Sequence, residues 1–202
     1  ALTQAAEFFQ KTGMSINAVK ALNTAGTAWF YTDEFNKAIE SYRLALKILG
    51  EGEEDQTEHQ RISVNLGLTY ATLRQPALAI PLLEKVIERA RETTDYYRLG
   101  DVHNALGMSY RYLGKLDESI KSYSRAMSIF AGVPDPIRYA HANLNCGIAH
   151  RLNNNLDEAQ THIQKALEIF QDKNDKPNIG NARAELARIA WQQDDLEKAQ
   201  SL

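Results

Sequence analysis

The sequence contains very little cysteine and no long apolar run. Cys146 is the only cysteine among 202 residues, so the chain cannot form an internal disulfide bond. A reducing, cytoplasmic location is therefore the simplest expectation. No segment approaches the roughly 20 consecutive apolar residues that a membrane span requires, and we expect no membrane partner.

The sequence also lacks an excess of charge of either sign. Its 23 basic and 26 acidic residues give a formal net charge of -3. A nucleic-acid backbone is held by a strong basic field, which this composition does not provide, so we expect this segment to bind no nucleic acid. With 44% hydrophobic and 24% charged residues, the composition is typical of a soluble, folded protein.

The usual signatures of catalysis and metal binding are missing. None of the five histidines lies in a motif such as H-E-x-x-H, and no glycine-rich loop follows a strand pattern. The run from Asp172 to Asp175 lacks the alternation and the glycine of a calcium loop. We therefore predict no catalytic residues, no cofactor and no metal, and a chain that is not an enzyme.

The sequence does contain an internal repeat. A small residue recurs in register along the chain, at Gly26, Gly67, Gly107, Gly147 and Ala187. A helical glycine costs about 1 kcal/mol relative to alanine, so its recurrence in register predicts that two helices approach closely there. His150 and Cys146 occupy positions that hold tyrosine and leucine in neighbouring repeats, and we expect both to be packed in the core.

Each repeat has the pattern of two helices joined by a short polar turn, and no alternating pattern predicts a strand. Apolar residues keep helical spacing on both sides of the turn. Acidic residues such as Asp117 and Glu118 open the second helix, where the helix dipole favours them. The pattern predicts first helices near residues 15–31, 57–72, 96–113, 137–152 and 177–192, and second helices near 34–49, 75–93, 116–131, 155–171 and 195–202.

The repeat resembles the tetratricopeptide repeat. The matching columns are Leu66-Gly67 with Tyr70 and Leu106-Gly107 with Tyr110 in first helices, and Ala79, Ala159 and Ala199 in second helices. The repeat is longer than the family's standard unit of roughly 34 residues, and the family's early tryptophan and closing proline are absent. Longer repeats of this kind are similar to those of kinesin light chains and of bacterial regulators, including peptide-pheromone receptors. The resemblance implies an all-α fold, a right-handed α-α superhelix (a solenoid).

The repeat columns predict one array over residues 1–202. Its parts are the second helix of a preceding repeat (1–13), four full repeats (14–53, 54–94, 95–134 and 135–174) and a partial fifth repeat (175–202). Because a solenoid normally ends in a polar capping helix, we expect the chain to be a fragment of a longer protein. Apolar residues near both ends, including Leu2, Phe8, Phe9 and Leu196, predict possible self-association through truncated ends.

A polar stripe on the first helices predicts the binding site. In each repeat, its members stand six and three or two residues before the small residue, and one and four residues after it. These positions lie close to one face of the helix. In tetratricopeptide arrays this face lines the concave groove. Asparagine can both donate to and accept from a peptide backbone, and arginine can grip a carboxylate. The candidate ligand-binding residues are Lys20, Asn23, Phe30, Arg61, Asn65, Asn104, Arg111, His141, Asn145, Arg151, Arg188 and Trp191, with Asp101 and Glu185 close to the stripe.

The resemblance and the stripe together predict a scaffold that binds a protein or peptide on its concave face. An alternative is the ligand- or peptide-sensing domain of a bacterial transcriptional or signalling regulator whose effector domain lies outside this segment. A helix-turn-helix domain upstream in the parent protein would favour the regulator.

Overall fold

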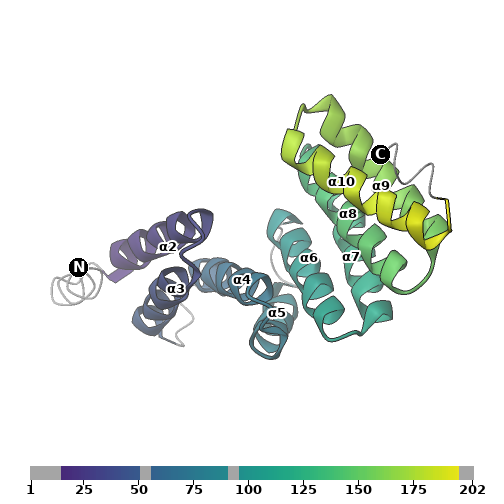
Figure 1. Ribbon diagram of the computed structural model, residues 1–202. Helices are drawn as coiled ribbons and strands as arrows, with labels where there is room; N and C mark the ends of the chain where they lie inside the picture. The colour runs from purple at the N-terminus through teal and green to yellow at the C-terminus, as the bar shows by residue number, and fades with distance from the viewer. Residues whose placement is uncertain (1–14, 51–55, 91–95, 196–202) are drawn as a thin grey trace. The chain divides into compact units, whose positions relative to one another are not determined.

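The computed structural model describes residues 15–50, 56–90 and 96–195, and throughout these ranges the secondary structure is α-helical, without strands. The first helices of the repeats are α2 (Ser15–Tyr31), α4 (Gln56–Thr72), α6 (Tyr96–Tyr112), α8 (Pro136–Leu152) and α10 (Lys176–Gln192) (Figure 1). The second helices are α3 (Phe35–Leu49), α5 (Pro76–Ala90), α7 (Leu116–Phe130) and α9 (Leu156–Asp172). These bounds confirm the predicted helices to within three residues.

Some predictions fall outside the described ranges. They are the helix expected at 1–13, the helix expected at 195–202 beyond its first residue, and the apolar end residues Leu2, Phe8, Phe9 and Leu196. The division into repeats also stays a prediction. None of the described helices is both long enough and apolar enough to cross a membrane.

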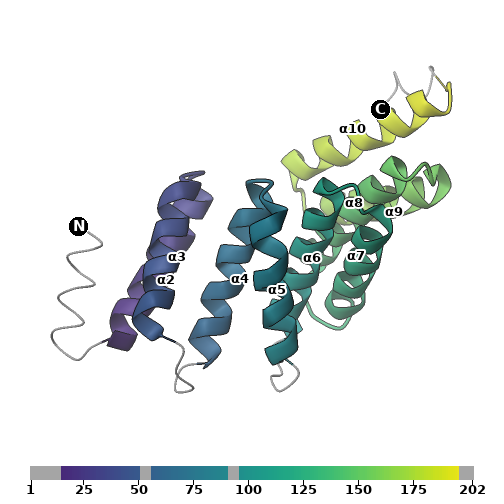
Figure 2. The same cartoon turned by 90° about the horizontal axis from the view of Figure 1, so that it is seen from below.

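The chain divides into two compact units, Ala1–Thr93 and Thr94–Leu202, and each is described by itself. In the first unit α2 packs against α3, α3 against α4, and α4 against α5 (Figure 2). In the second unit each helix from α6 to α10 packs against the next one. The first helices also contact one another directly, α6 with α8 and α8 with α10. The second unit therefore has an inner row of first helices backed by second helices.

The glycine column marks the contact between the two helices of a repeat. A Cβ atom placed on Gly107 would lie 2.6 Å from Cε1 of Tyr123, a side chain of α7 that is fully buried. A Cβ on Gly147 would lie 2.5 Å from Cγ1 of Ile163 and 2.9 Å from the carbonyl oxygen of Ala159, both on α9. Real Cβ contacts are longer than this, so the close packing expected from the repeating glycines is confirmed at both positions.

Helices α8 and α10 begin with the same capping arrangement. The carboxylate of Asp135 accepts a hydrogen bond from the backbone N–H of Arg138 at 3.1 Å, and Asp175 accepts one from the N–H of Asn178 at 3.3 Å. Each aspartate satisfies a backbone donor that the helix itself leaves unpaired. Pro136 and Pro177 stand in the first helical positions, where a missing N–H costs nothing. These caps fix the starts of the two helices that carry the site described next.

Candidate functional site: a groove between α8 and α10

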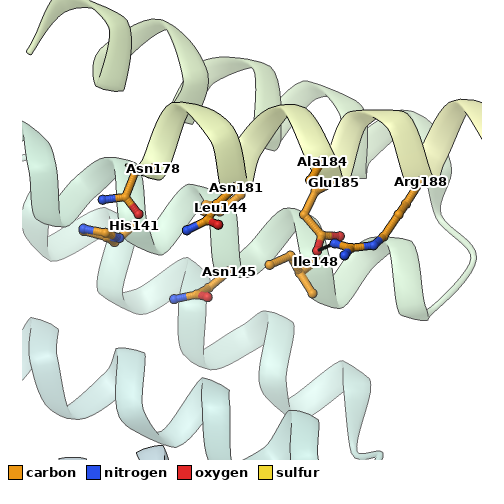
Figure 3. Close-up of a pocket in the computed structure, with 9 residues that line it drawn as sticks. All are labelled: His141, Leu144, Asn145, Ile148, Asn178, Asn181, Ala184, Glu185 and Arg188. Carbon is orange, nitrogen blue, oxygen red and sulfur yellow. Dashed lines mark hydrogen bonds and ion pairs between the residues drawn. The ribbon is translucent and has the colours of Figure 1, made fainter. Parts of the chain in front are cut away.

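An open pocket of about 340 Å³ lies between α8 and α10 in the second unit. We call it the α8–α10 groove. In Figure 3 the side chains of α10 point toward α8 across it. The residues that line it are His141, Leu144, Asn145, Ile148, Asn178, Asn181, Ala184, Glu185 and Arg188.

Three carboxamide side chains give the groove its polar character. Asn145 comes from α8, and Asn178 and Asn181 come from α10. The Nδ2 group of Asn145 donates to Oδ1 of Asn104 at 3.3 Å, and Nδ2 of Asn178 donates to Oδ2 of Asp175 at 2.8 Å. A carboxamide has two N–H donors and a carbonyl acceptor. Each of these two side chains therefore keeps hydrogen-bonding capacity after its bond within the protein.

Apolar side chains and a neutral imidazole complete this part of the groove. Leu144 is almost fully buried and Ile148 half-buried. The ring of His141 packs edge-on against Phe170, with 5.2 Å between ring centroids. Burial is the main cause that lowers the pKa of His141, with nearby carboxylates opposing the shift. His141 is therefore a neutral donor and acceptor near pH 7.

Glu185 holds two arginines at the other end of the groove. Its Oε2 accepts a hydrogen bond from Nε of Arg151 at 2.9 Å, and its Oε1 pairs with Arg188. The side chains of Arg151 and Glu185 are only 15% and 12% exposed, whereas that of Arg188 is 57% exposed. The guanidinium of Arg151 is already paired with Glu185, which reduces its capacity to bind a carboxylate from a ligand. Arg188 keeps an accessible face.

We predict that Glu185→Ala destabilises the chain by about 1–2 kcal/mol, between the cost expected for an exposed pair and for a fully buried one. The reason is that Arg151 would be left partly buried without its anion. The free energy of unfolding in urea checks this, with Glu168→Ala on the exposed face of α9 as the matched control. Equal stability of Glu185→Ala and the unaltered chain would contradict the prediction.

The asparagines of the predicted stripe meet in pairs within each unit. Asn65 donates from Nδ2 to Oδ1 of Asn23 at 2.9 Å, and Asn145 donates to Asn104 in the same way. Each pair joins the first helices of consecutive repeats. Asn23 is only 7% exposed, so this asparagine contributes to helix packing as well as to the stripe.

The structure separates the other predicted residues. From the predicted set only His141, Asn145 and Arg188 line the groove, while Lys20, Asn23, Phe30, Arg61 and Asn65 lie in the first unit. Phe30 packs against the rings of Tyr31 and Phe35, and Arg61 pairs with Glu58. The Nε of Arg111 is buried, and its guanidinium lies 5.2 Å from the ring centroid of Tyr112. Trp191 is 67% exposed.

The sequence analysis missed two polar residues that line the groove, Asn178 and Asn181. Asn181 stands six residues before Ala187, in the column that also holds His141 and Arg61, so the repeat register could have found it. Asn178 stands one turn earlier, outside the stripe as defined. Its role in capping α10 and in lining the groove follows only from the structure.

Cys146 is packed in the core as the repeat columns predict, whereas His150 is only half-buried. Cys146 is fully buried, and burial raises the pKa of its thiol to about 12. The thiol is therefore protonated near neutral pH and is a poor nucleophile. Burial also lowers the pKa of His150 and of its neighbour His162 on α9.

Comparison with known families identifies the repeat. The model of the tetratricopeptide repeat family matches residues 58–132 and 138–202. The chain therefore belongs to the tetratricopeptide repeat family.

Two curated relatives are distant and much longer. The anaphase-promoting complex subunit CDC16 of Saccharomyces cerevisiae is 24% identical over 165 residues, which cover 82% of this chain and 18% of the relative. The transcriptional activator NprA of Geobacillus stearothermophilus is 23% identical over 142 residues, 70% of this chain and 35% of the relative. The chain thus spans about a fifth and a third of the lengths of these relatives.

Solved structures with the same fold include three kinds of protein. BtubC (BKLC) from P. vanneervenii matches 99% of this chain and 83% of its own at a TM-score of 0.79 and 20% identity. The match to a Rap protein complexed with competence and sporulation factor covers 89% of this chain and 50% of the Rap chain, with a TM-score of 0.79 and 18% identity. The match to repeats of a putative kinesin light chain from Podosopora anserina covers 91% of this chain and 90% of that chain, with a TM-score of 0.70 and 17% identity. The predicted fold class, an all-α right-handed superhelix of tetratricopeptide type, is confirmed.

Proposed function

We propose that the chain is a non-enzymatic scaffold that binds an extended peptide segment of a partner protein in the α8–α10 groove. The observation that carries this proposal is the convergence of three carboxamides, from Asn145, Asn178 and Asn181, on one open groove. An extended peptide presents alternating N–H and C=O groups, and a carboxamide can bond to either. Leu144 and Ile148 offer an apolar surface for one small side chain of the ligand.

The charges in the groove define the ligand further. Glu185 offsets one of the two positive charges of Arg151 and Arg188, and His141 is neutral. The groove therefore favours a peptide that is near neutral along most of its length. Because Arg188 keeps an exposed guanidinium, we expect one carboxylate of the ligand at that end. Fewer carboxylate contacts are therefore expected than the arginines of the predicted stripe alone suggest.

A second candidate is the sensor domain of a bacterial regulator. It is favoured by the similarity to NprA, named as a transcriptional activator, and to a Rap protein solved in complex with competence and sporulation factor. Both candidates use the same groove and differ in what lies beyond this segment. Sequencing the complete parent gene for a DNA-binding or enzymatic domain separates them.

The test starts from a random peptide library displayed on phage and selected against the chain. We expect the selected peptides to bind Asn181→Ala about 3–10-fold more weakly by calorimetry, because one hydrogen bond contributes about 0.5–1.5 kcal/mol. Asn145→Ala should weaken binding at least as much, since Asn145 is half-buried whereas Asn181 is exposed. The matched control is Gln164→Ala on α9, which is exposed and does not line the groove.

Circular dichroism and thermal unfolding serve as the folding controls. They matter most for Asn145→Ala, which also removes the bond to Asn104. Asn181 is exposed, so its variant should keep the stability of the unaltered chain. Peptides that bind all three variants with equal affinity would show that another surface binds them.

A further inference from the structure

Three side chains with metal-binding atoms converge in the fourth repeat, and none of them lines the α8–α10 groove. Cys146 and His150 lie one turn apart on one face of α8, and His162 lies on α9. Their candidate ligand atoms all lie within 4.8 Å of one another. We propose that Cys146, His150 and His162 form a binding site for a zinc-type divalent ion, with its fourth position open to water.

The donor set fits this class of ion. One thiolate and two imidazoles suit Zn²⁺ or Co²⁺, whereas Mg²⁺ and Ca²⁺ prefer oxygen ligands. Zinc–sulfur and zinc–nitrogen bonds of about 2.3 and 2.0–2.1 Å place tetrahedral ligand atoms about 3.3–3.6 Å apart. The three side chains would therefore have to close by about 1 Å around an ion, which is within reach of side-chain rotation. The imidazole centroids are 5.4 Å apart, near the separation of about 5 Å expected for two rings on one ion. The rings are stacked, with 11° between their planes, so the ring of His150 would also have to turn about its Cβ–Cγ bond to bind the same ion as His162.

A hydrogen bond with Asn143 orients the ring of His162 for metal binding. Asn143 is fully buried, and its Nδ2 donates to the carbonyl oxygen of Tyr139 at 2.9 Å. That bond turns Oδ1 of Asn143 toward Nδ1 of His162, 3.1 Å away. An amide oxygen can only accept, so Nδ1 of His162 carries the proton and Nε2 keeps its lone pair. Metal-binding histidines are commonly oriented by such a partner on the other ring nitrogen.

A second, independent observation concerns a buried ring nitrogen of His150. Its Nδ1 is buried and has no hydrogen-bond partner among the residues that the structure describes. A buried polar atom without a partner is unfavourable and rare in folded proteins. A bound ion would satisfy one nitrogen of this ring. Access exists on the imidazole side, since His150 and His162 are half-buried while Cys146 is fully buried.

The repeat itself shows that these residues are not required for packing. One repeat earlier the same three columns hold Leu106, Tyr110 and Ser122, which cannot form such a site. In the second repeat, the first two columns again hold leucine and tyrosine. Ligand-type side chains therefore replace ordinary core residues together in the fourth repeat. The signal was present in the sequence as Cys-x-x-x-His on one helix face, but the third ligand comes from the next helix.

The test is a titration of the chain, kept reduced, with Co²⁺ and then Zn²⁺. We expect one Co²⁺ per chain, with the visible bands of a four-coordinate ion and a near-ultraviolet band from the new sulfur–cobalt bond. The thiol gives its proton to the buffer as that bond forms. Zn²⁺ should displace Co²⁺ and raise the melting temperature, since an ion bound only by the folded chain stabilises it.

The neighbouring repeat supplies variants that should fold. Cys146→Leu, His150→Tyr and His162→Ser each restore the residue found one repeat earlier. Removing a ligand should weaken Co²⁺ binding by more than the roughly 10–100-fold that follows loss of an orienting partner, and Cys146→Leu should abolish the sulfur–cobalt band. His141→Gln, which changes a histidine of the α8–α10 groove, is the matched control and should bind Co²⁺ normally.

Two results would overturn the site. One is the absence of stoichiometric Co²⁺ binding by the unaltered, reduced chain. The other is equal binding by Cys146→Leu or His162→Ser, which would show that the substituted residue is not a ligand. Helical circular dichroism of each variant confirms that a loss of binding is not a loss of fold.

Discussion

Gly147→Ala is expected to destabilise the chain by about 2 kcal/mol through overpacking, although alanine is the better helix former. The added methyl group would meet Cγ1 of Ile163 at 2.5 Å and the carbonyl oxygen of Ala159 at 2.9 Å. Ile163 is fully buried, and a backbone oxygen inside a helix cannot rotate aside. We therefore expect an overpacking cost near the upper end of the usual range of about 1–3 kcal/mol. The gain of about 1 kcal/mol in helix propensity offsets only part of it.

Gly180→Ala is the matched control and should change stability in the opposite direction. Gly180 is also helical, but a Cβ atom there would meet no atom within 4 Å. Only the propensity gain remains, about 0.5–1 kcal/mol of added stability. Urea unfolding of both variants measures the difference. Two stabilised variants would mean that α8 and α9 separate easily at the glycine.

Acidification from pH 7 to pH 5 should remove about 2 kcal/mol of stability through His103 alone. His103 on α6 is 6% exposed, and burial, assisted by the charge of Arg125, lowers its pKa from 6.5 to about 4. A pKa that is lower in the folded chain favours the neutral ring. The contribution to stability is therefore complete above pH 6.5 and is lost as the pH falls from 6.5 toward 4.

The variant His103→Leu isolates this contribution. Leucine is already present four residues before the repeat's glycine in the first repeat, as Leu22, where it is 3% exposed. Nδ1 of His103 is buried without a hydrogen-bond partner in the described part of the chain, so leucine should fit and stabilise. Unfolding free energies at pH 7, 6 and 5 should fall less steeply for His103→Leu than for the unaltered chain. The other histidines are present in both, so the difference reports His103.

The helices could be predicted because each repeat shows the same sequence pattern at the contact between its two helices. The glycine column locates the crossing point of two helices, and four copies of the pattern average out local irregularities of propensity. Ile163 and Tyr123, the residues that fill the space beside Gly147 and Gly107, both stand 16 positions after their glycine. One repeat with this spacing would have been ambiguous, whereas a register that recurs along the chain is not.

The site could be predicted only as a helix face. The stripe contains His141, Asn145 and Arg188, but the sequence does not show that Glu185 holds Arg151. That pair joins a position four residues after one repeat's glycine to a position two residues before the small residue of the next. Such offsets depend on how far consecutive first helices slide past each other. The repeat spacing of the sequence does not specify how far one first helix is displaced along the next.

The bond between Asn145 and Asn104 makes the groove part of a thermodynamic linkage. Asn145 lines the α8–α10 groove and donates to Oδ1 of Asn104 on α6. A ligand that recruits this N–H, rather than the second N–H of the same carboxamide, leaves an acceptor on α6 unsatisfied, which costs about 1 kcal/mol unless water replaces the donor. Coupling between sites is reciprocal. Any molecule that supplied Asn104 with a new donor would therefore release Asn145 and strengthen the peptide binding that we propose for the groove.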